Sequence, residues 1–594
     1  MKLLIVLAFC AVVCLNGCTT DNKKSSENRK LEVRGWNILS DDIDKGLYAI
    51  ESAEKYQINH LQLSHQLIMD LKDVRNPKKL ETTRRLIKSA HDNGVNKVFV
   101  WDHALYNLKY YPDRFKTTDG LIDLDKPEFW NWLKNDYRSM LDSLPKLDGI
   151  ILTFIETGAH VEDQYSVKWK TEKDKLANMV DSLASVIIDE RGLEMYIRTF
   201  IYHKAELDAL IGCVNTVKHP DVKVMTKEVP HDFFLTHPIS DFISKINKDV
   251  LIEFDLGHEY NGQGVIASIL PEITVERWKY YSKKDNVIGY VARTDRYNDT
   301  QNIGRSTEMN IYALNRISED PDMAVETIVE EFVTEKYGES SAQILKNVFL
   351  KTDDIITSSL YTLGLHMNWH SSINYENENN YSRHCSGKWM DNPEVMIKHG
   401  VNKSFHYWKD IINHLSPARY KSKETSPGKA SNLFIEAPWI INDGWVSPDE
   451  KMNLEYLKYI LIEKEYGVNM AKWALEEIRS LENKIADQND FNELLQLYER
   501  TYLTAQLYLA TSKVYFGFRA YLNDDKNAVI NEIISDGLNN IDPICERILD
   551  YKFKGPKGQY HWLYDVHNAK TLSSRVLGGW DVYGNVKFKK SVGE

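Results

Sequence analysis

Cysteine is scarce in this chain of 594 residues, which has six cysteines in all. Beyond the first 18 residues only Cys213, Cys385 and Cys545 remain, far apart and without any C-x-x-C pair. Such a pattern excludes a disulfide framework and a cysteine-based metal site. We therefore expect no metal and no cofactor.

An excess of basic residues is also missing. Lys and Arg number 74 against 86 Asp and Glu, which gives a formal net charge of −12. This balance argues against nucleic acid as a partner and against a basic membrane-binding face. The apolar fraction of 43% is typical of a globular protein, and the length predicts two or three domains.

The N-terminus carries an apolar stretch, Leu3–Val13, that follows Lys2 and is too short to span a bilayer as a mature helix. It leads into Leu15-Asn16-Gly17-Cys18, which resembles the cleavage box of bacterial lipoproteins. We expect residues 1–17 to be a signal peptide and Cys18 to carry the lipid. Residues 18–32 would form a flexible tether to a bacterial membrane, most simply the outer one. An ordinary secretory signal, the alternative, also implies export.

Strand-like and helix-like segments alternate from Arg34 onward. The expected strands are Arg34–Leu39, His60–Leu63, Lys97–Trp101, Gly149–Phe154, Met195–Phe200, Val222–Lys227, Leu251–Asp255 and Val287–Arg293. Eight strands with helices between them predict a (β/α)8 barrel over residues 33–320. An open doubly wound sheet is the alternative, but no Gly-rich loop follows the first strand.

The strand signal fades after Met323. Most of the remaining chain has helical periodicity with mixed charge, which predicts an all-α domain over residues 321–594. Within it, Gly555–Trp580 is rich in glycine and aromatic residues, and we expect a closing loop packed on the helices.

Three acidic residues come directly after expected strands: Glu156, Asp232 and Glu259. In a barrel these side chains would converge on the mouth at the carboxyl ends of the strands. Cleavage of a glycosidic bond needs one carboxylic acid to protonate the leaving oxygen and one carboxylate to activate water or attack. The alternative interpretation is that these are ordinary charges on surface loops.

Several segments in the same order resemble the α-glucuronidases of glycoside hydrolase family 67. The similar segments are Ile155–Gly158, Arg198–Tyr202, Met225–Phe233, His258–Gly262, Gly289–Arg296, Asn310–Pro321 and Gly364–His366. Three features depart from that family, the first being Glu228 and Val229 where its strand-six loop has Asn and Gly. Its sizeable domain ahead of the barrel has no counterpart here, and His231 and His258 stand where it usually has an apolar residue and Gln.

The resemblance implies a role for each matching residue. Glu156 would be the general acid, and Asp232 and Glu259 the carboxylates that activate water. Arg198 and Lys227 would bind the carboxylate of a uronic acid, for which Arg offers a planar fork and Lys a point charge. We also assign Tyr260 and Trp101 to substrate binding. An ion pair between Arg198 and one of the three acids is the structural alternative.

Three functions compete at this stage. The first is exo-hydrolysis of a terminal, glucuronic-type uronic acid from an oligosaccharide derived from a polysaccharide. The second is elimination of water across C4–C5 of the same sugar, or of a sugar if that is the leaving group, with His231 or His258 as the base. The third is a glycan-binding lipoprotein without catalysis, which the three acids argue against.

Overall fold

The computed structural model describes most of the chain. The described residues are 31–153, 157–199, 204–229, 233, 235, 239–296, 300–362, 365–366, 368–369, 372–373, 440–441, 444–445, 453–524, 526–551 and 560–577. Four residues singled out from the sequence lie outside them: Cys18, Glu156, His231 and Asp232.

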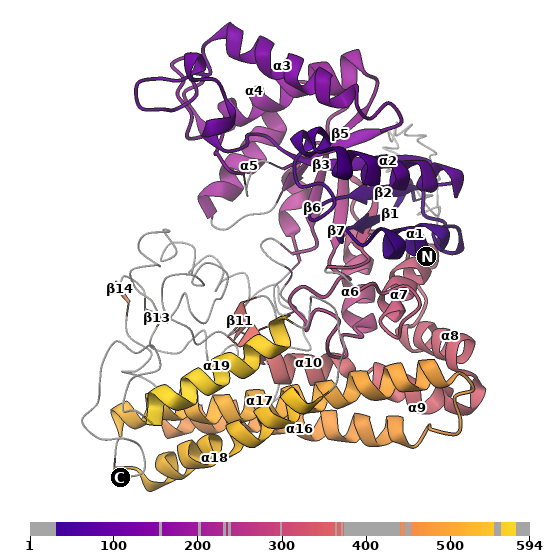
Figure 1. The fold of residues 1–594 in the computed structure, drawn as a ribbon, viewed down its shortest axis with the longest axis vertical. Coiled ribbons are helices and arrows are strands. Elements are labelled where there is room, and N and C mark those ends of the chain that lie inside the picture. The colour runs from indigo at the N-terminus through magenta and orange to yellow at the C-terminus, as the bar shows by residue number, and fades with distance from the viewer. Residues whose placement is uncertain are drawn as a thin grey trace, which may run out of the picture.

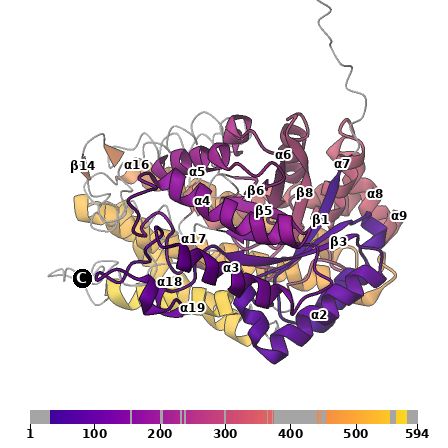
Figure 2. The same cartoon turned by 90° about the horizontal axis from the view of Figure 1, so that it is seen from above.

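Eight parallel strands form a closed barrel in chain order, β1 to β8, and the last strand pairs with the first. Their bounds are Val33–Ile38, His60–Leu63, Lys97–His103, Gly149–Thr153, Glu194–Thr199, Lys223–Lys227, Val250–Phe254 and Val287–Arg293. The barrel and the helices around it occupy the upper half of Figure 1, and Figure 2 shows them from above. The predicted (β/α)8 barrel is thereby confirmed.

Helices connect the strands around the outside of the barrel. They are α1 (Ile43–Glu51), α2 (Pro77–Asp92), α3 (Pro127–Leu141), α4 (Glu172–Ala184), α5 (Lys204–Thr216), α6 (Pro271–Tyr281) and α7 (Glu308–Glu319). Proline at the first position begins α2, α3 and α6, where its missing N–H costs no helical hydrogen bond. The side chain of Asn76 also caps α2 by accepting from two backbone N–H groups.

Alternate residues of each strand face opposite sides of the barrel wall. Those that face outward, such as Ile252 and Phe254 of β7, join the large apolar core shared with the helices. Those that face inward form a separate cluster that fills the barrel: Phe99, Trp101, Ile151, Tyr196, Met225, Leu251, Ile288 and Val291. The interior is thus a packed core.

The rest of the described chain is mainly helical. Its helices are α8 (Val325–Tyr337), α9 (Glu339–Phe349), α10 (Thr352–Leu360), α16 (Leu454–Arg479), α17 (Gln488–Asn523), α18 (Ala528–Asp550) and α19 (Tyr560–Leu577). Only two-residue strands in three small pairs interrupt them in the described residues: β9 (Tyr361–Thr362) with β10 (Leu365–His366), β11 (Asn368–Trp369) with β12 (Ser372–Ile373), and β13 (Ile440–Ile441) with β14 (Gly444–Trp445). The long helices α16, α17 and α18 lie side by side below the barrel in Figure 1. No helix in the described residues combines the length and apolar character needed to span a bilayer.

One expectation about this region is wrong. Most of Gly555–Trp580 forms α19 rather than a closing loop. Its buried apolar residues recur every three or four positions: Trp562, Val566, Ala569, Leu572 and Val576. That period is helical, and the apolar face it creates packs against α17 and α18 despite the glycine- and aromatic-rich composition.

The helical region and the barrel share apolar cores. The largest core runs from the strands through α8 and α9 to the first half of α17. A second core joins Val229, Phe233 and Tyr260, from the loops after β6 and β7, to α16, α17 and α18. The helical region therefore supports the two loops that carry predicted site residues. A domain boundary at residue 320 stays a prediction.

Candidate active site

Four consecutive strands place charged side chains inside the mouth of the barrel. Arg198 on β5, Lys227 on β6, Glu253 on β7 and Arg293 on β8 each occupy an inward position at or next to the end of their strand. All four side chains are buried, at 0–2% exposed. Charges at such positions are costly unless they are paired, so their contacts determine what this mouth can bind.

Glu253 is the centre of this group. Arg198 Nε lies 2.7 Å from its Oε2, and Arg293 Nε lies 2.9 Å from its Oε1. Burial alone raises the pKa of Glu253, but the two arginines outweigh it and hold the pKa below its usual value. Glu253 is therefore an ionised carboxylate that fixes two guanidinium groups in position.

Glu259 is held by a second pair of arginines. Arg293 Nη1 lies 2.6 Å from Glu259 Oε2, and Arg296 Nη2 lies 3.0 Å from its Oε1. Arg293 thus bridges Glu253 and Glu259 with different edges of one guanidinium. An ionised carboxylate in this environment has the charge state that a base or a nucleophile requires.

Two aromatic rings lie against these cations. The guanidinium carbon of Arg198 is 4.4 Å from the Trp101 ring centre, and Trp101 Nε1 donates to Gln62 at 2.9 Å. The centre of the Phe233 ring lies 4.9 Å from Lys227 Nζ and 4.6 Å from the Arg293 guanidinium carbon. Trp101 is only 3% exposed, so in this structure it orients Arg198 and offers little open surface for sugar stacking.

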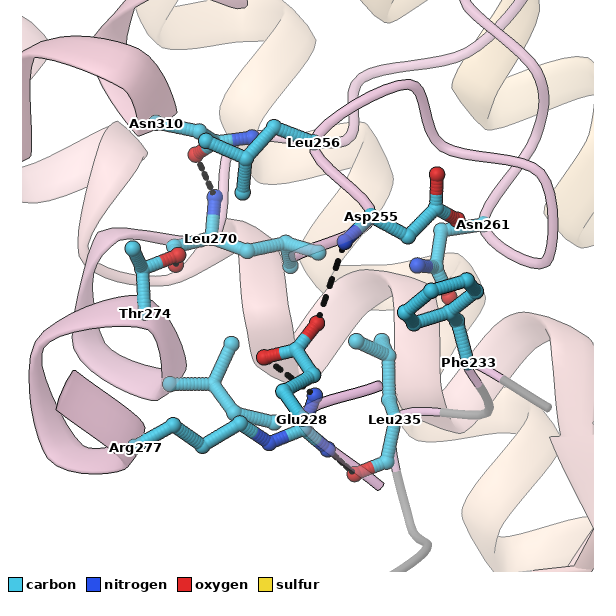
Figure 3. A pocket seen from close by; sticks show the side chains of 11 residues that line it. Glu228, Phe233, Leu235, Asp255, Leu256, Asn261, Leu270, Thr274, Arg277 and Asn310 are labelled. Atoms are coloured by element: carbon cyan, nitrogen blue, oxygen red, sulfur yellow. Dashed lines mark hydrogen bonds and ion pairs between the residues drawn. The ribbon is translucent and has the colours of Figure 1, made fainter. Parts of the chain in front are cut away.

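A small cavity lies beside the mouth, between the loops after β6 and β7 and helix α6 (Figure 3). Glu228 spans it: its Oε1 accepts from the backbone N–H of Asp255 at 3.3 Å, and its Oε2 lies 3.1 Å from Arg277 Nη1. Asp255 directs its carboxyl away from Glu228 toward Asn261 (Figure 3). Its Oδ2 accepts from the backbone N–H of Glu259 at 2.9 Å. Burial raises the pKa of Asp255 to about 7.

His258 and Tyr260 are both buried. His258 is 0% exposed, its Nε2 lies 2.8 Å from Asn302 Oδ1, and burial lowers its pKa to about 4. Its backbone has a positive φ of 63°, which belongs to the tight turn that delivers Glu259. Tyr260 packs in the apolar core shared with the helical region. These environments are those of residues that shape the loop.

The structure thus brings together Arg198, Lys227, Trp101 and Glu259 of the predicted site. It adds four residues that the sequence analysis did not select: Glu253, Asp255, Arg293 and Arg296. A signal for Glu253 was present, because a charged residue two positions after Leu251 must face the same inner side of a buried strand. Arg198 forms an ion pair with this glutamate, which was not among the acids considered from the sequence. The roles assigned to Glu156, Asp232 and His231 stay predictions.

Within the described part of the chain, no three His, Cys, Asp or Glu side chains are grouped so that they could hold a metal ion. The charged groups described at the mouth are carboxylates, guanidinium groups and one ammonium group.

No family model matches this chain, and no curated protein matches it in sequence. Solved structures do resemble it. A GH138 enzyme that targets pectin rhamnogalacturonan II superposes with a TM-score of 0.51 at 9% identity, over 92% of this chain and 68% of that one. An O-GlcNAc hydrolase of Thermobaculum terrenum gives a TM-score of 0.43 at 10% identity, over 92% and 95% of the two chains. At these identities the first likeness supports the fold alone, and the second adds no argument.

Proposed function

We propose that this protein is a carbohydrate-active enzyme that acts on the terminal uronic acid of an oligosaccharide, most simply by exo-hydrolysis. The observation that supports this best is the charge of the mouth. The described residues there include four cations, Arg198, Lys227, Arg293 and Arg296, against two paired carboxylates, Glu253 and Glu259.

This excess of positive charge suits an anionic sugar. Lys227, which the resemblance assigns to the uronic carboxylate, lies against the same Phe233 ring as Arg293. A carboxylate that approaches Arg293 would meet a charge-assisted donor already held in place by Glu253 and Glu259. A neutral sugar would gain much less from the same groups, so the cluster favours uronic acids over neutral sugars.

In the hydrolytic reaction Glu156 would protonate the leaving oxygen, and Asp232 with Glu259 would activate water. The arginines keep Glu259 ionised, as a base requires. The GH138 enzyme among the structural neighbours is consistent with this chemistry on the same fold.

Elimination of water across C4–C5 is the second candidate, and the same cations favour it. Removal of the C5 proton places negative charge on the uronic carboxylate, and fixed guanidinium groups stabilise such charge without reorganising. His258 is an unsuitable base in the observed conformation because it is buried against Asn302. His231 or a carboxylate would have to remove the proton.

Mass spectrometry of products from uronic-acid-ended oligosaccharides separates the two reactions. Hydrolysis releases a free uronic acid, whereas elimination leaves the chain intact but lighter by one water and creates ultraviolet absorbance from the new double bond. Oligosaccharides ended by glucose in place of glucuronic acid are the matched control. Equal turnover of both substrates would contradict the proposal.

His231→Ala and His258→Ala test the base. If the wild-type protein forms an unsaturated product and either variant loses activity, the reaction is elimination. Full activity without both imidazoles would leave the carboxylates as the acid–base groups, and the product detected by mass spectrometry would then decide between hydrolysis and elimination.

A further inference from the structure

Asp255 differs from the other buried carboxylates of the mouth in its partners. Glu253 and Glu259 each contact two arginines, and Glu228 contacts Arg277. Asp255 is also buried, yet no cation in the described residues forms an ion pair with it, and its Oδ1 accepts no hydrogen bond. A buried carboxylate oxygen without a partner is costly, and adding a proton to it removes that cost.

The loop backbone closes over the same oxygen. A side-chain carbon added at Gly257 would lie 3.3 Å from Asp255 Oδ1 and 2.3 Å from the carbonyl oxygen of Asp295. The loops after β7 and β8 are therefore too close for a water molecule to enter from that side. The other oxygen, Oδ2, is already occupied by the N–H of Glu259.

Charged and titratable groups surround Asp255 from each neighbouring element. Arg293 of β8 favours its ionised form, while Glu259 of its own loop and Glu228 after β6 oppose it. Arg277 of α6 is neutralised by Glu228, and Tyr361 of β9 stays neutral because burial raises its pKa. Asp255 thus adds a negative charge to the mouth only when it loses its proton.

We propose that Asp255 is a positioning residue whose proton sets the affinity of the mouth for an acidic sugar. This inference rests on the proposed function. With Asp255 protonated, the four cations among the described residues of the mouth exceed the two carboxylates paired with them, Glu253 and Glu259, by two charges. When it ionises, that excess falls by one, and an incoming uronic carboxylate also meets a like charge behind Glu259. The pKa of Asp255, raised to about 7, places this change near neutral pH.

The sign of the effect follows from linkage. An anion binds more tightly to the protonated form, so its affinity falls as the pH rises through the pKa of Asp255. Binding above that pH must draw a proton onto Asp255. The uronic carboxylate itself stays ionised throughout, and His258, with a pKa of about 4, stays neutral.

Calorimetric titration of the full chain with D-glucuronate tests the inference. From about pH 5.5 to about pH 8.5 we expect the dissociation constant to rise by up to about tenfold, which is the limit for a change of about one unit in the pKa of Asp255 on binding. The neutral methyl ester of glucuronate should show no such rise. In Asp255→Asn, which keeps an oxygen for the N–H of Glu259, the affinity for glucuronate should be the same at both pH values.

Asp295→Asn is the matched control. Asp295 is a second buried carboxyl, after the neighbouring strand, and burial raises its pKa to about 6. That variant should keep the fall in affinity near pH 7. If Asp255→Asn does not fold, the wild-type protein still decides: titration at about pH 7.5 in two buffers of different ionisation enthalpy should reveal proton uptake on binding.

The outcomes are distinct. Glucuronate that binds with a pH-independent affinity, or without proton uptake, overturns the role of Asp255 and leaves the proposed function standing. A wild-type protein that does not bind glucuronate at either pH overturns both.

Discussion

Arg198 Nε lies 2.7 Å from Glu253 Oε2, and neither side chain is more than 2% exposed. The guanidinium also lies over the ring of Trp101. An arginine held in this way by an acid and an aromatic face loses little freedom when a ligand arrives, which is the condition for a preorganised anion site.

Replacing Arg198 by Lys should reduce the preference for uronic-acid-ended over glucose-ended substrates by at least about tenfold, because a charged hydrogen bond is worth roughly 1.5–3 kcal/mol. Lysine keeps the charge, but without a planar fork it cannot bind Glu253 and a substrate carboxylate at the same time. The measurement is the ratio of kcat/KM for the two substrates. Arg138→Lys, which alters the exposed pair with Glu190, should leave that ratio unchanged. An unchanged ratio in Arg198→Lys would count against its role.

Glu253→Gln should destabilise the fold by roughly 3–5 kcal/mol, because it leaves two buried guanidinium groups without their carboxylate. Unfolding in urea measures the effect. Glu190→Gln removes an exposed partner of Arg138 and serves as the control, with little change expected. A Glu253→Gln protein as stable as the wild type would show that Arg198 and Arg293 are satisfied by other groups.

Asp295 gives a prediction on the pH dependence of stability. Its carboxyl accepts from the N–H groups of Leu39 and Ser40, and burial raises its pKa to about 6. A carboxyl with a raised folded-state pKa stabilises the fold most at low pH, and that contribution is lost as the pH rises through about 6. The stability of the wild type relative to Asp295→Asn should therefore fall between about pH 4 and about pH 6, by about 1.4 kcal/mol per pH unit. Parallel stability curves for the two proteins would refute this.

Glu156→Gln tests the proposed general acid. Loss of the proton donor should lower kcat by roughly 10²–10⁴-fold, with little effect on folding. Glu162→Gln, in the same loop after β4, is the control, since Glu162 contacts only His160 among the ion pairs of the described residues. Wild-type turnover in Glu156→Gln would exclude it as the acid.

Cys18→Ser tests the proposed lipid anchor. A lipoprotein N-terminus carries more than one acyl chain, and stable anchoring needs at least two such signals. Without the thiol the protein should move from the membrane fraction to the soluble fraction on cell fractionation. Continued membrane association of the variant would contradict the proposal.

Much of the fold could be read from the sequence because its signals are local. The alternation of apolar strands and amphipathic helices predicts the barrel, and the structure places the predicted strands within one or two residues of their expected bounds. The period of two along β7 also places Glu253 inside the barrel with Leu251. Where composition masked the period, as in α19, the prediction was wrong.

The order of strand and carboxylate along the chain was likewise enough to select Glu259, and the resemblance was enough to select Arg198 and Lys227. Their partners were not accessible to such reasoning. Arg198 and Glu253 are 55 positions apart, and Arg293 and Glu253 are 40 apart. Any of the 86 acidic residues was a possible partner. Closure of the barrel decided the pairing, because it brings the ends of β5, β7 and β8 around one mouth.

The tertiary structure also determines which ionisable side chains are buried and what partners they have. His258 and Asp255 lie three positions apart and look alike in the sequence as groups for acid–base chemistry. Packing sets His258 against Asn302 with a lowered pKa and leaves Asp255 with one unpartnered oxygen and a raised pKa. The sequence determined which ionisable groups reach the mouth, and the desolvation and ion pairing that only the folded barrel imposes decided which of them carry charge.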